Sequence, residues 1–427
     1  MKKHLKNLIY HPLFSGSAIM IIGSNSVSVL NYLYHLILGR LLGPEGYGEL
    51  ASLISLIGLL GIVPSSINLV IVKYVSSTKD NEEINNLTSW LNSKLLKVSF
   101  LFFTVILLAS PAISSFLHIN RIIYLVFISL SFLFSLQALF NRAILQGFLK
   151  FKELIFSVLA ENITKLIISV FLVYLGFSVG GAMVAFLIAT IVGWYITSSY
   201  LKFSKTTHTI VPKNIKSMVQ YSIPVFVQAI SMTSLYSSDI ILVKHFFSSF
   251  DAGIYASIST LGKIIFFGAG PISAVMFPLV SQRQSKGLNH YSIFVMSFLA
   301  TLILAVVVLI IYWLAPQFAI ELLYGKLYLV GANLLIWYGI FITLFTLSVL
   351  LISYGLSVGR IKIVYFSVVA ALAQILLILF FHSSLIQVIT ISIVVSALLL
   401  ACLFIYSTYG RTNRSRDKID FSNSPGI

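Results

Sequence analysis

The chain carries little charge and almost no cysteine. Only 9% of its 427 residues are Asp, Glu, Lys or Arg, whereas a soluble domain has about 25%. A single cysteine, Cys402, excludes a disulfide framework within the chain. The eight histidines are scattered and no H-E-x-x-H occurs, so no metal centre is expected.

Motifs for phosphate binding and for catalysis are also missing. Gly262-Lys263 lacks the glycine five residues earlier that a phosphate-cradling loop requires. A membrane glycosyltransferase or polymerase needs carboxylates in a sizeable outer loop. Glu45 and Glu49 instead lie in a turn-like GPEGYGE that marks a helix boundary. We therefore expect no enzymatic activity and no cofactor.

Long apolar runs cover nearly the whole chain. Hydrophobic residues make up 58% of it, and the mean hydropathy is +1.00. Roughly 20 apolar residues in a helix cross a ~30 Å hydrocarbon core, so the pattern predicts an all-α polytopic membrane protein. The twelve predicted spans are 13–38, 50–72, 95–117, 122–145, 154–175, 179–201, 217–243, 253–279, 291–315, 329–356, 361–381 and 385–406.

The basic residues predict the orientation. The first apolar stretch is too long for a signal peptide and has no cleavage site, so it is expected to remain as a span. With a cytoplasmic N-terminus, 22 of the Lys and Arg residues fall in cytoplasmic segments. This asymmetry predicts that both termini are cytoplasmic and that the polar tail after residue 408 is disordered. The four outer basic residues are Arg40, Arg121, Lys244 and Lys326.

The net charge of +16 does not indicate nucleic-acid binding. The basic residues lie in short breaks between spans and form no continuous basic face. No nucleic-acid partner is expected.

The two halves of the chain resemble each other at an offset of about 204 to 210. The end of the first span, LILGRLLGPEGYGELAS, matches the end of the seventh, IILVKHFFSSFDAGIYAS, and this match aligns Gly48 with Gly253. A second match joins residues 145–160, LQGFLKFKELIFSVLA, to residues 356–370, LSVGRIKIVYFSVVA. It aligns Ser157 with Ser367. Both matches fall at the same place in the order of spans.

This repeat predicts two six-helix lobes, 1–205 and 206–408, followed by a cytoplasmic tail, 409–427. Six spans per lobe is an even number, so both lobes begin on the cytoplasmic side. They are then parallel repeats, related by a pseudo-two-fold axis along the membrane normal, around a central cavity.

Four charges lie inside predicted spans and away from their ends. Each costs about 2.5–3.5 kcal/mol at the bilayer centre. Glu161 and Lys165 are separated by four residues, with the acid first, which favours a pair on one helix. They lie about 13 Å and 20 Å from the cytoplasmic start of their span. Two interpretations remain open: a mutually neutralised packing pair, or a cavity-facing pair that meets substrate or a coupling ion.

The other two in-span charges are Asp239 and Lys263. Asp239 lies close to the outer boundary and is interpreted as a structural or lobe-closing residue. Lys263 has no acid within helical reach, which favours a water-filled cavity. Arg40 and Lys244 are candidates for gating or for interface anchoring. Asn25 is a polar in-span residue, either an interhelical hydrogen-bond partner or a cavity ligand.

The stretch GRLLGPEGYGELASLISLIGLL (39–60) resembles the Wzx-type oligosaccharide flippases. These form the polysaccharide-transporter branch of the multidrug/oligosaccharidyl-lipid/polysaccharide exporter superfamily. Two further segments resemble elements of the branch, namely LYSSDIILVKHFFSSFDAGIYA (235–256) and LQGFLKFKE (145–153). The likeness extends over most of the chain. The chain departs from the pattern where its second copy lacks the Gly-Pro-Glu turn, and it has no spans thirteen and fourteen.

The resemblance implies a flippase in the bacterial inner membrane. It would move an undecaprenyl-diphosphate-linked repeat unit of O-antigen, lipopolysaccharide, capsule or similar surface polysaccharide to the outer leaflet by alternating access. The implied partners are this lipid-linked oligosaccharide, membrane lipids, a polysaccharide polymerase and a chain-length regulator.

Two alternative functions fit the same resemblance. A multidrug or cation antiporter would need an acidic, aromatic pocket, whereas the deep charges here favour an anionic cargo. A lipid II flippase would require the same chemistry as the oligosaccharide flippase. We hypothesise that Lys165 and Lys263, one from each lobe, form a cationic site for the diphosphate, with Glu161 and Asn25 as further cavity candidates.

Overall fold

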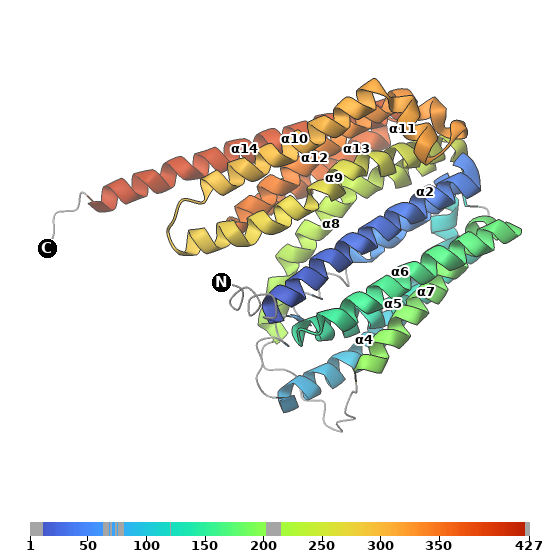
Figure 1. The fold of residues 1–427 in the computed structure, drawn as a ribbon, viewed down its shortest axis with the longest axis horizontal. Helices are drawn as coiled ribbons and strands as arrows, with labels where there is room; N and C mark the ends of the chain where they lie inside the picture. Colours follow the sequence, from blue (N-terminus) through green and yellow to red (C-terminus); the bar gives the residue numbers. More distant parts are fainter. Residues whose placement is uncertain are drawn as a thin grey trace, which may run out of the picture. The chain divides into compact units, whose positions relative to one another are not determined.

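The structure is a computed structural model that describes residues 12–62, 68, 71–72, 75, 81–119, 121–201 and 215–422. Regular structure in these ranges is helical throughout, with no strand (Figure 1). The predicted basic segments at residues 1–11 and 202–214, and most of 63–80, lie outside the described residues. The all-α fold predicted from the sequence is confirmed.

The first half of the chain forms a series of long helices. Its elements are α2 (Pro12–Leu60), α4 (Asn81–Phe116), α5 (Ile123–Gly147), α6 (Phe151–Leu172), the π-helical turn η1 (Val173–Phe177) and α7 (Ser178–Tyr200).

The second half adds six long helices and three short elements. They are α8 (Ile215–Phe246), α9 (Ser249–Ser285), α10 (Tyr291–Leu314), α11 (Pro316–Leu323), η2 (Lys326–Gly331), α12 (Ala332–Ser357), η3 (Ile361–Ile363), α13 (Val364–Phe380) and α14 (Leu385–Ser422).

Two of the continuous helical stretches each contain two predicted spans. In α2 the backbone leaves the helical region at Gly43, with φ 67° and ψ 177°, and Pro44 follows. Glycine adopts this positive φ without steric cost, and proline is favoured at the first position of a new helix. The GPEGYGE segment is therefore a helix boundary, as predicted. The second stretch, Phe151–Tyr200, is interrupted at η1, where Gly176 has φ 92°.

Membrane-crossing helices can be counted only in the described residues. There, nine stretches are long and apolar enough to cross a membrane. One of these nine, the Phe151–Tyr200 stretch, divides in two at η1. Helix α2, which is not among the nine, divides in two at Gly43, so that one helical segment lies at each of the twelve predicted spans.

The chain divides into two compact units. Unit 1 consists of Met1–Phe226 with Phe247–Gly253, and unit 2 consists of Val227–Phe246 with Ile254–Ile427. In unit 1, α4 packs on α5, and α7 packs on both α5 and α6. In unit 2, α10 packs on α12, and α14 packs on both α12 and α13 (Figure 1). The same order of neighbours in both units agrees with the internal repeat.

The loops after α5 and α12 repeat each other in detail. Leu149 and Gly359 both have positive φ, 59° and 82°. The next amide, Lys150 or Arg360, donates to the carbonyl five residues earlier at 2.8 Å or 2.9 Å. This is the Schellman ending of a helix. The matched Ser157 and Ser367 are also alike, since both are buried and each donates to the carbonyl three residues earlier.

A close backbone contact joins α2 to the first turn of α9 within unit 1. A Cβ atom on Gly48 would lie 2.5 Å from the Ser249 carbonyl oxygen, and a Cβ on Gly253 would overlap the Pro44 carbonyl. Small residues allow this approach in membrane helices. The two glycines that the repeat aligns therefore lie on either side of one contact.

The C-terminal tail differs from the prediction. Helix α14 continues through Ser422 rather than ending near residue 406. Past Ser407 the sequence contains one glycine and no proline before Ser424, and nothing in that stretch forces the helix to stop. The expectation of a disordered tail is wrong for residues 409–422.

Candidate functional site

Glu161 forms an ion pair with an arginine from a neighbouring helix. Arg142 on α5 donates to Glu161 Oε2 at 2.5 Å, and both side chains remain less than one-fifth exposed. The same guanidinium donates to Ser157 Oγ at 3.1 Å and to the Ser157 carbonyl at 3.3 Å. The predicted pairing of Glu161 with Lys165 is therefore wrong. Arg142 lies within α5, five residues before the end of the helix at Gly147.

Helix α7 leaves room for this ion pair. Gly193 faces it, and a Cβ at this position would overlap Glu161 Oε2 and lie 3.0 Å from Arg142 Nη2. Beside it, Asn141 donates to Thr197 Oγ1 at 3.2 Å and to Ser198 Oγ at 3.0 Å. A polar layer thus links α5, α6 and α7 inside unit 1.

Lys165 points from α6 to α2. Its Nζ donates to Asn31 Oδ1 at 2.6 Å and lies 4.8 Å from the centre of the Tyr34 ring. Asn31 Oδ1 is a neutral acceptor, so this hydrogen bond brings no counter-charge to the ammonium. A cation over a tyrosine face gains about 0.5–2 kcal/mol.

Lys263 has an analogous environment in unit 2. Its Nζ lies 5.3 Å from the centre of the Tyr236 ring on α8, and it makes no hydrogen bond to a described residue. The three N–H donors of this ammonium therefore have no acceptor among the described residues. Each unit therefore holds one lysine ammonium over a tyrosine ring of its own first span, α2 or α8.

Asp239 is the centre of a buried hydrogen-bonded network in unit 2. Its Oδ2 accepts from Tyr255 at 2.8 Å and from Tyr338 at 2.9 Å, and its Oδ1 accepts from the Ile240 amide at 2.9 Å. Ser259 and Tyr338 are 2.8 Å apart. Because the Tyr338 proton goes to Asp239, Ser259 is the donor to Tyr338. Three donors balance the carboxylate and connect α8, α9 and α12, which supports the structural interpretation of this acid.

The remaining predicted residues have different environments. Lys244 is buried, with only 2% of its surface exposed. Arg40 is exposed at the end of the first half of α2. Asn25 is also exposed and donates to its own helix, to the Ile21 carbonyl, at 2.9 Å.

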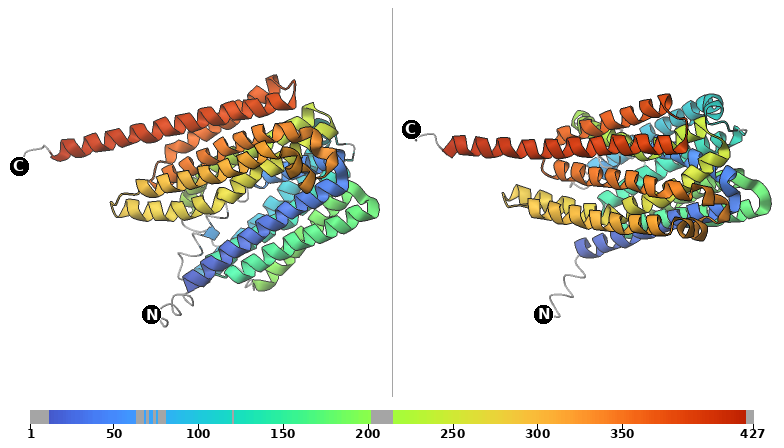
Figure 2. Two further views of the ribbon diagram at one scale, coloured as in Figure 1. Left: turned by 45° about the horizontal axis from the view of Figure 1, so that its top comes forward. Right: turned by 90° about the horizontal axis from the view of Figure 1, so that it is seen from above.

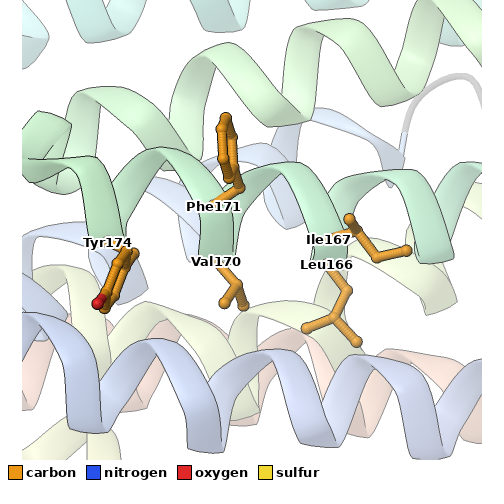
Figure 3. Close-up of a pocket in the computed structure, with 5 residues that line it drawn as sticks. All are labelled: Leu166, Ile167, Val170, Phe171 and Tyr174. Atoms are coloured by element: carbon orange, nitrogen blue, oxygen red, sulfur yellow. The ribbon is translucent and has the colours of Figure 1, made fainter.

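An apolar groove of about 400 Å³ lies along the C-terminal half of α6 and the start of η1. Figure 3 shows Leu166, Val170 and Tyr174 pointing to the same side of the helix. None of the seven predicted site residues lines it. The groove is hydrocarbon-like and does not coincide with either lysine.

Sequence reasoning missed the partners of the in-span charges. Tyr34, Tyr236, Tyr255 and Tyr338 were not singled out, although each lies inside a predicted span. Arg142 is five residues before the turn at Gly147, a depth at which it can face a neighbouring helix.

Comparison with known proteins places the chain in a family. Residues 14–284, more than half of the chain, match the family described as polysaccharide biosynthesis protein. The uncharacterized membrane protein MJ1375 of Methanocaldococcus jannaschii is 28% identical over 292 residues, which cover 64% of this chain and 68% of that protein.

Solved structures share the fold at low sequence identity. An inward-facing MATE family multidrug resistance transporter of the MOP superfamily matches with a TM-score of 0.75 and 14% identity, over 93% of this chain and 96% of that one. The lipid II flippase MurJ in an inward closed conformation matches with a TM-score of 0.74 and 15% identity, over 91% and 87% of the two chains.

These comparisons confirm the predicted fold and the resemblance to the polysaccharide branch of the superfamily. The protein is a multi-pass membrane protein that belongs to the polysaccharide biosynthesis protein family.

Proposed function

We propose that the protein is a flippase for undecaprenyl-diphosphate-linked oligosaccharide repeat units, and not an enzyme. It works by alternating access in the bacterial cytoplasmic membrane, with both termini in the cytoplasm. Its cargo is a precursor of O-antigen, capsule or a similar surface polysaccharide. A polymerase and a chain-length regulator act on the exported unit as its partners.

The observation that carries this proposal is the environment of the two in-span lysines. Lys165 and Lys263 each present an ammonium over a tyrosine face, and neither has a carboxylate as its hydrogen-bond partner. A diphosphate supplies the acceptors and the negative charge that such ammonium groups lack. We propose that each lysine contacts the anionic headgroup during its passage.

The same geometry disfavours a drug or cation antiporter. Aromatic faces attract organic cations, but here each tyrosine face is already covered by an ammonium of the same sign. Asp239 is wholly buried and accepts from three donors, so it is not presented to a cationic cargo.

The membrane potential is sufficient to drive export of an anionic headgroup. Moving one charge through 100 mV changes the free energy by about 2.3 kcal/mol. Outward movement of a dianion across an inside-negative membrane is therefore downhill by about 4.6 kcal/mol per 100 mV. No ATPase domain is needed for this step.

The proposal is tested by charge reversal at Lys263. Lys263→Arg is expected to retain partial export, whereas Lys263→Glu abolishes surface polysaccharide and leaves lipid-linked precursor in the inner leaflet. The matched control is Lys326→Glu, because Lys326 is 84% exposed outside the long helices. Protein levels in the membrane are matched for all variants.

Three results would contradict the proposal. Wild-type export by the Lys263→Glu variant would show that Lys263 does not contact the headgroup. Loss of resistance to cationic drugs on deletion of the gene, with unchanged surface polysaccharide, would identify an antiporter. Transport of lipid II in place of a repeat unit by reconstituted protein would assign the lipid II alternative.

A further inference from the structure

The connection between α10 and α12 is longer and more structured than its counterpart in unit 1. In unit 1 the equivalent connection, from α4 to α5, covers only residues 117–122. In unit 2 the chain leaves α10 at Leu314 and forms α11 and η2 before α12 begins at Ala332. Figure 2 shows these short elements at the end of unit 2 opposite the C-terminus of α14.

Helix α11 has three distinct faces. Ala319 and Ile320 are buried against unit 2, whereas Phe318 and Leu322 are 66% and 56% exposed. Gln317 and Glu321 are also exposed. At 100° per residue, Phe318 and Leu322 form an apolar face that lies between the buried face and the polar face.

The 3₁₀ turn η2 repeats this arrangement. Residues three apart are aligned along a 3₁₀ helix. Tyr328 and Gly331 are buried on one side, whereas Leu327 and Val330 are 67% and 74% exposed on another. Lys326 is exposed and lies 3.9 Å from Glu321.

Exposed apolar side chains are also found at the end of α10, directly before α11 in the chain. Ile310, Trp313 and Leu314 are exposed at the end of α10, which is apolar enough to cross a membrane. The exposed apolar surface of a membrane-crossing helix is expected to contact lipid, and only Ala315 separates α10 from α11.

We propose that α11 and η2 lie flat in the bilayer interface at the end of α10, with phospholipid as their partner. The Phe318, Leu322, Leu327 and Val330 side chains enter the boundary of the acyl chains. Gln317, Glu321 and Lys326 face the headgroups and water. An amphipathic helix in an interface buries its apolar face ~5–10 Å into this boundary. The topology predicted above assigns this interface to the outer leaflet.

The test measures depth at single labelled positions. Cys402 is the only cysteine, so Cys402→Ala gives a cysteine-free background. Phe318→Cys, Leu322→Cys, Leu327→Cys and Val330→Cys are labelled with a nitroxide in full-length protein reconstituted into phosphatidylglycerol–phosphatidylethanolamine vesicles. Collision with oxygen, which enters the bilayer, is compared with collision with a water-soluble nickel chelate.

The expected result is a several-fold higher oxygen-to-nickel ratio at these four positions than at the matched controls. The controls are Gln317→Cys and Glu321→Cys, one residue before Phe318 and Leu322 on the same helix. Leu314→Cys, at the lipid-facing end of α10, gives the reference for the acyl region.

Two outcomes would overturn the inference. Ratios as low as those of the controls would place the segment in water. Protection from both oxygen and nickel would show that a protein surface, and not lipid, covers the apolar face. Because the measurement needs no transport, its result is independent of the proposed function.

Discussion

Glu161 is expected to be energetically coupled to Arg142 and only weakly to Lys165. The test uses two double-mutant cycles that share Glu161→Gln, one with Arg142→Met and one with Lys165→Met. The coupling energy is the part of the double variant's effect on unfolding that the single variants do not account for. The sequence alone favours Lys165 as the partner, so the two cycles distinguish sequence neighbours from tertiary neighbours.

The magnitudes follow from the contacts. Arg142 donates to Glu161 at 2.5 Å, and the two side chains are 16% and 19% exposed. Hydrogen bonds to charged groups contribute about 1.5–3 kcal/mol. Residual exposure places the expected coupling of Glu161 with Arg142 at about 1–2 kcal/mol. Lys165 donates to Asn31 instead, so its coupling to Glu161 is that of an unbonded i, i+4 pair, below about 0.5 kcal/mol.

The assay is the free energy of unfolding of the purified variants in mixed micelles of mild detergent and dodecyl sulfate, followed by circular dichroism. Arg142→Lys replaces Arg142→Met if the latter does not accumulate, because lysine keeps the charge and loses the fork geometry. A larger coupling of Glu161 with Lys165 than with Arg142 would refute the assignment of partners.

Three further changes test other parts of the structure. Gly193→Ala is expected to lower the free energy of unfolding by about 1–3 kcal/mol through overpacking against the Arg142–Glu161 pair. The control is Gly58→Ala, where a Cβ would meet no atom within 4 Å, and its free energy of unfolding should be unchanged or slightly higher. Equal losses of stability for the two variants would contradict this reasoning. Tyr338→Phe removes one donor from Asp239 and one acceptor from Ser259, so a loss of about 1.5–3 kcal/mol is expected in the same assay. Tyr365→Phe, at an exposed tyrosine of α13, is its control, and no difference between the two would show that the Asp239 network adds no stability. A reporter active only in the periplasm, fused after Tyr409, should remain inactive because the basic residues predict a cytoplasmic C-terminus; strong activity would show an odd number of spans.

Several properties of the protein were determined by the sequence itself. Apolar length fixes whether a helix can cross a bilayer, and this depends on local composition alone. The twelve segments were predictable for this reason. The boundary at Gly43-Pro44 was predictable from its turn-forming residues, and the repeated loops after α5 and α12 from the match between the two halves of the sequence. The repeat also aligned Gly48 with Gly253, although the contact at which both lie was not predicted.

The partners of the charged residues were decided only by the tertiary structure. Sequence spacing states which side chains share a face of one helix, but not which side chains of other helices meet that face. Glu161 therefore pairs with Arg142 and not with Lys165, and Asp239 accepts from two tyrosines, the more distant of them 99 positions along the chain. The short helix α11 was missed for a similar reason. Its apolar residues are too few to mark a span. Which of them remain exposed depends on the face of α11 that packs against unit 2.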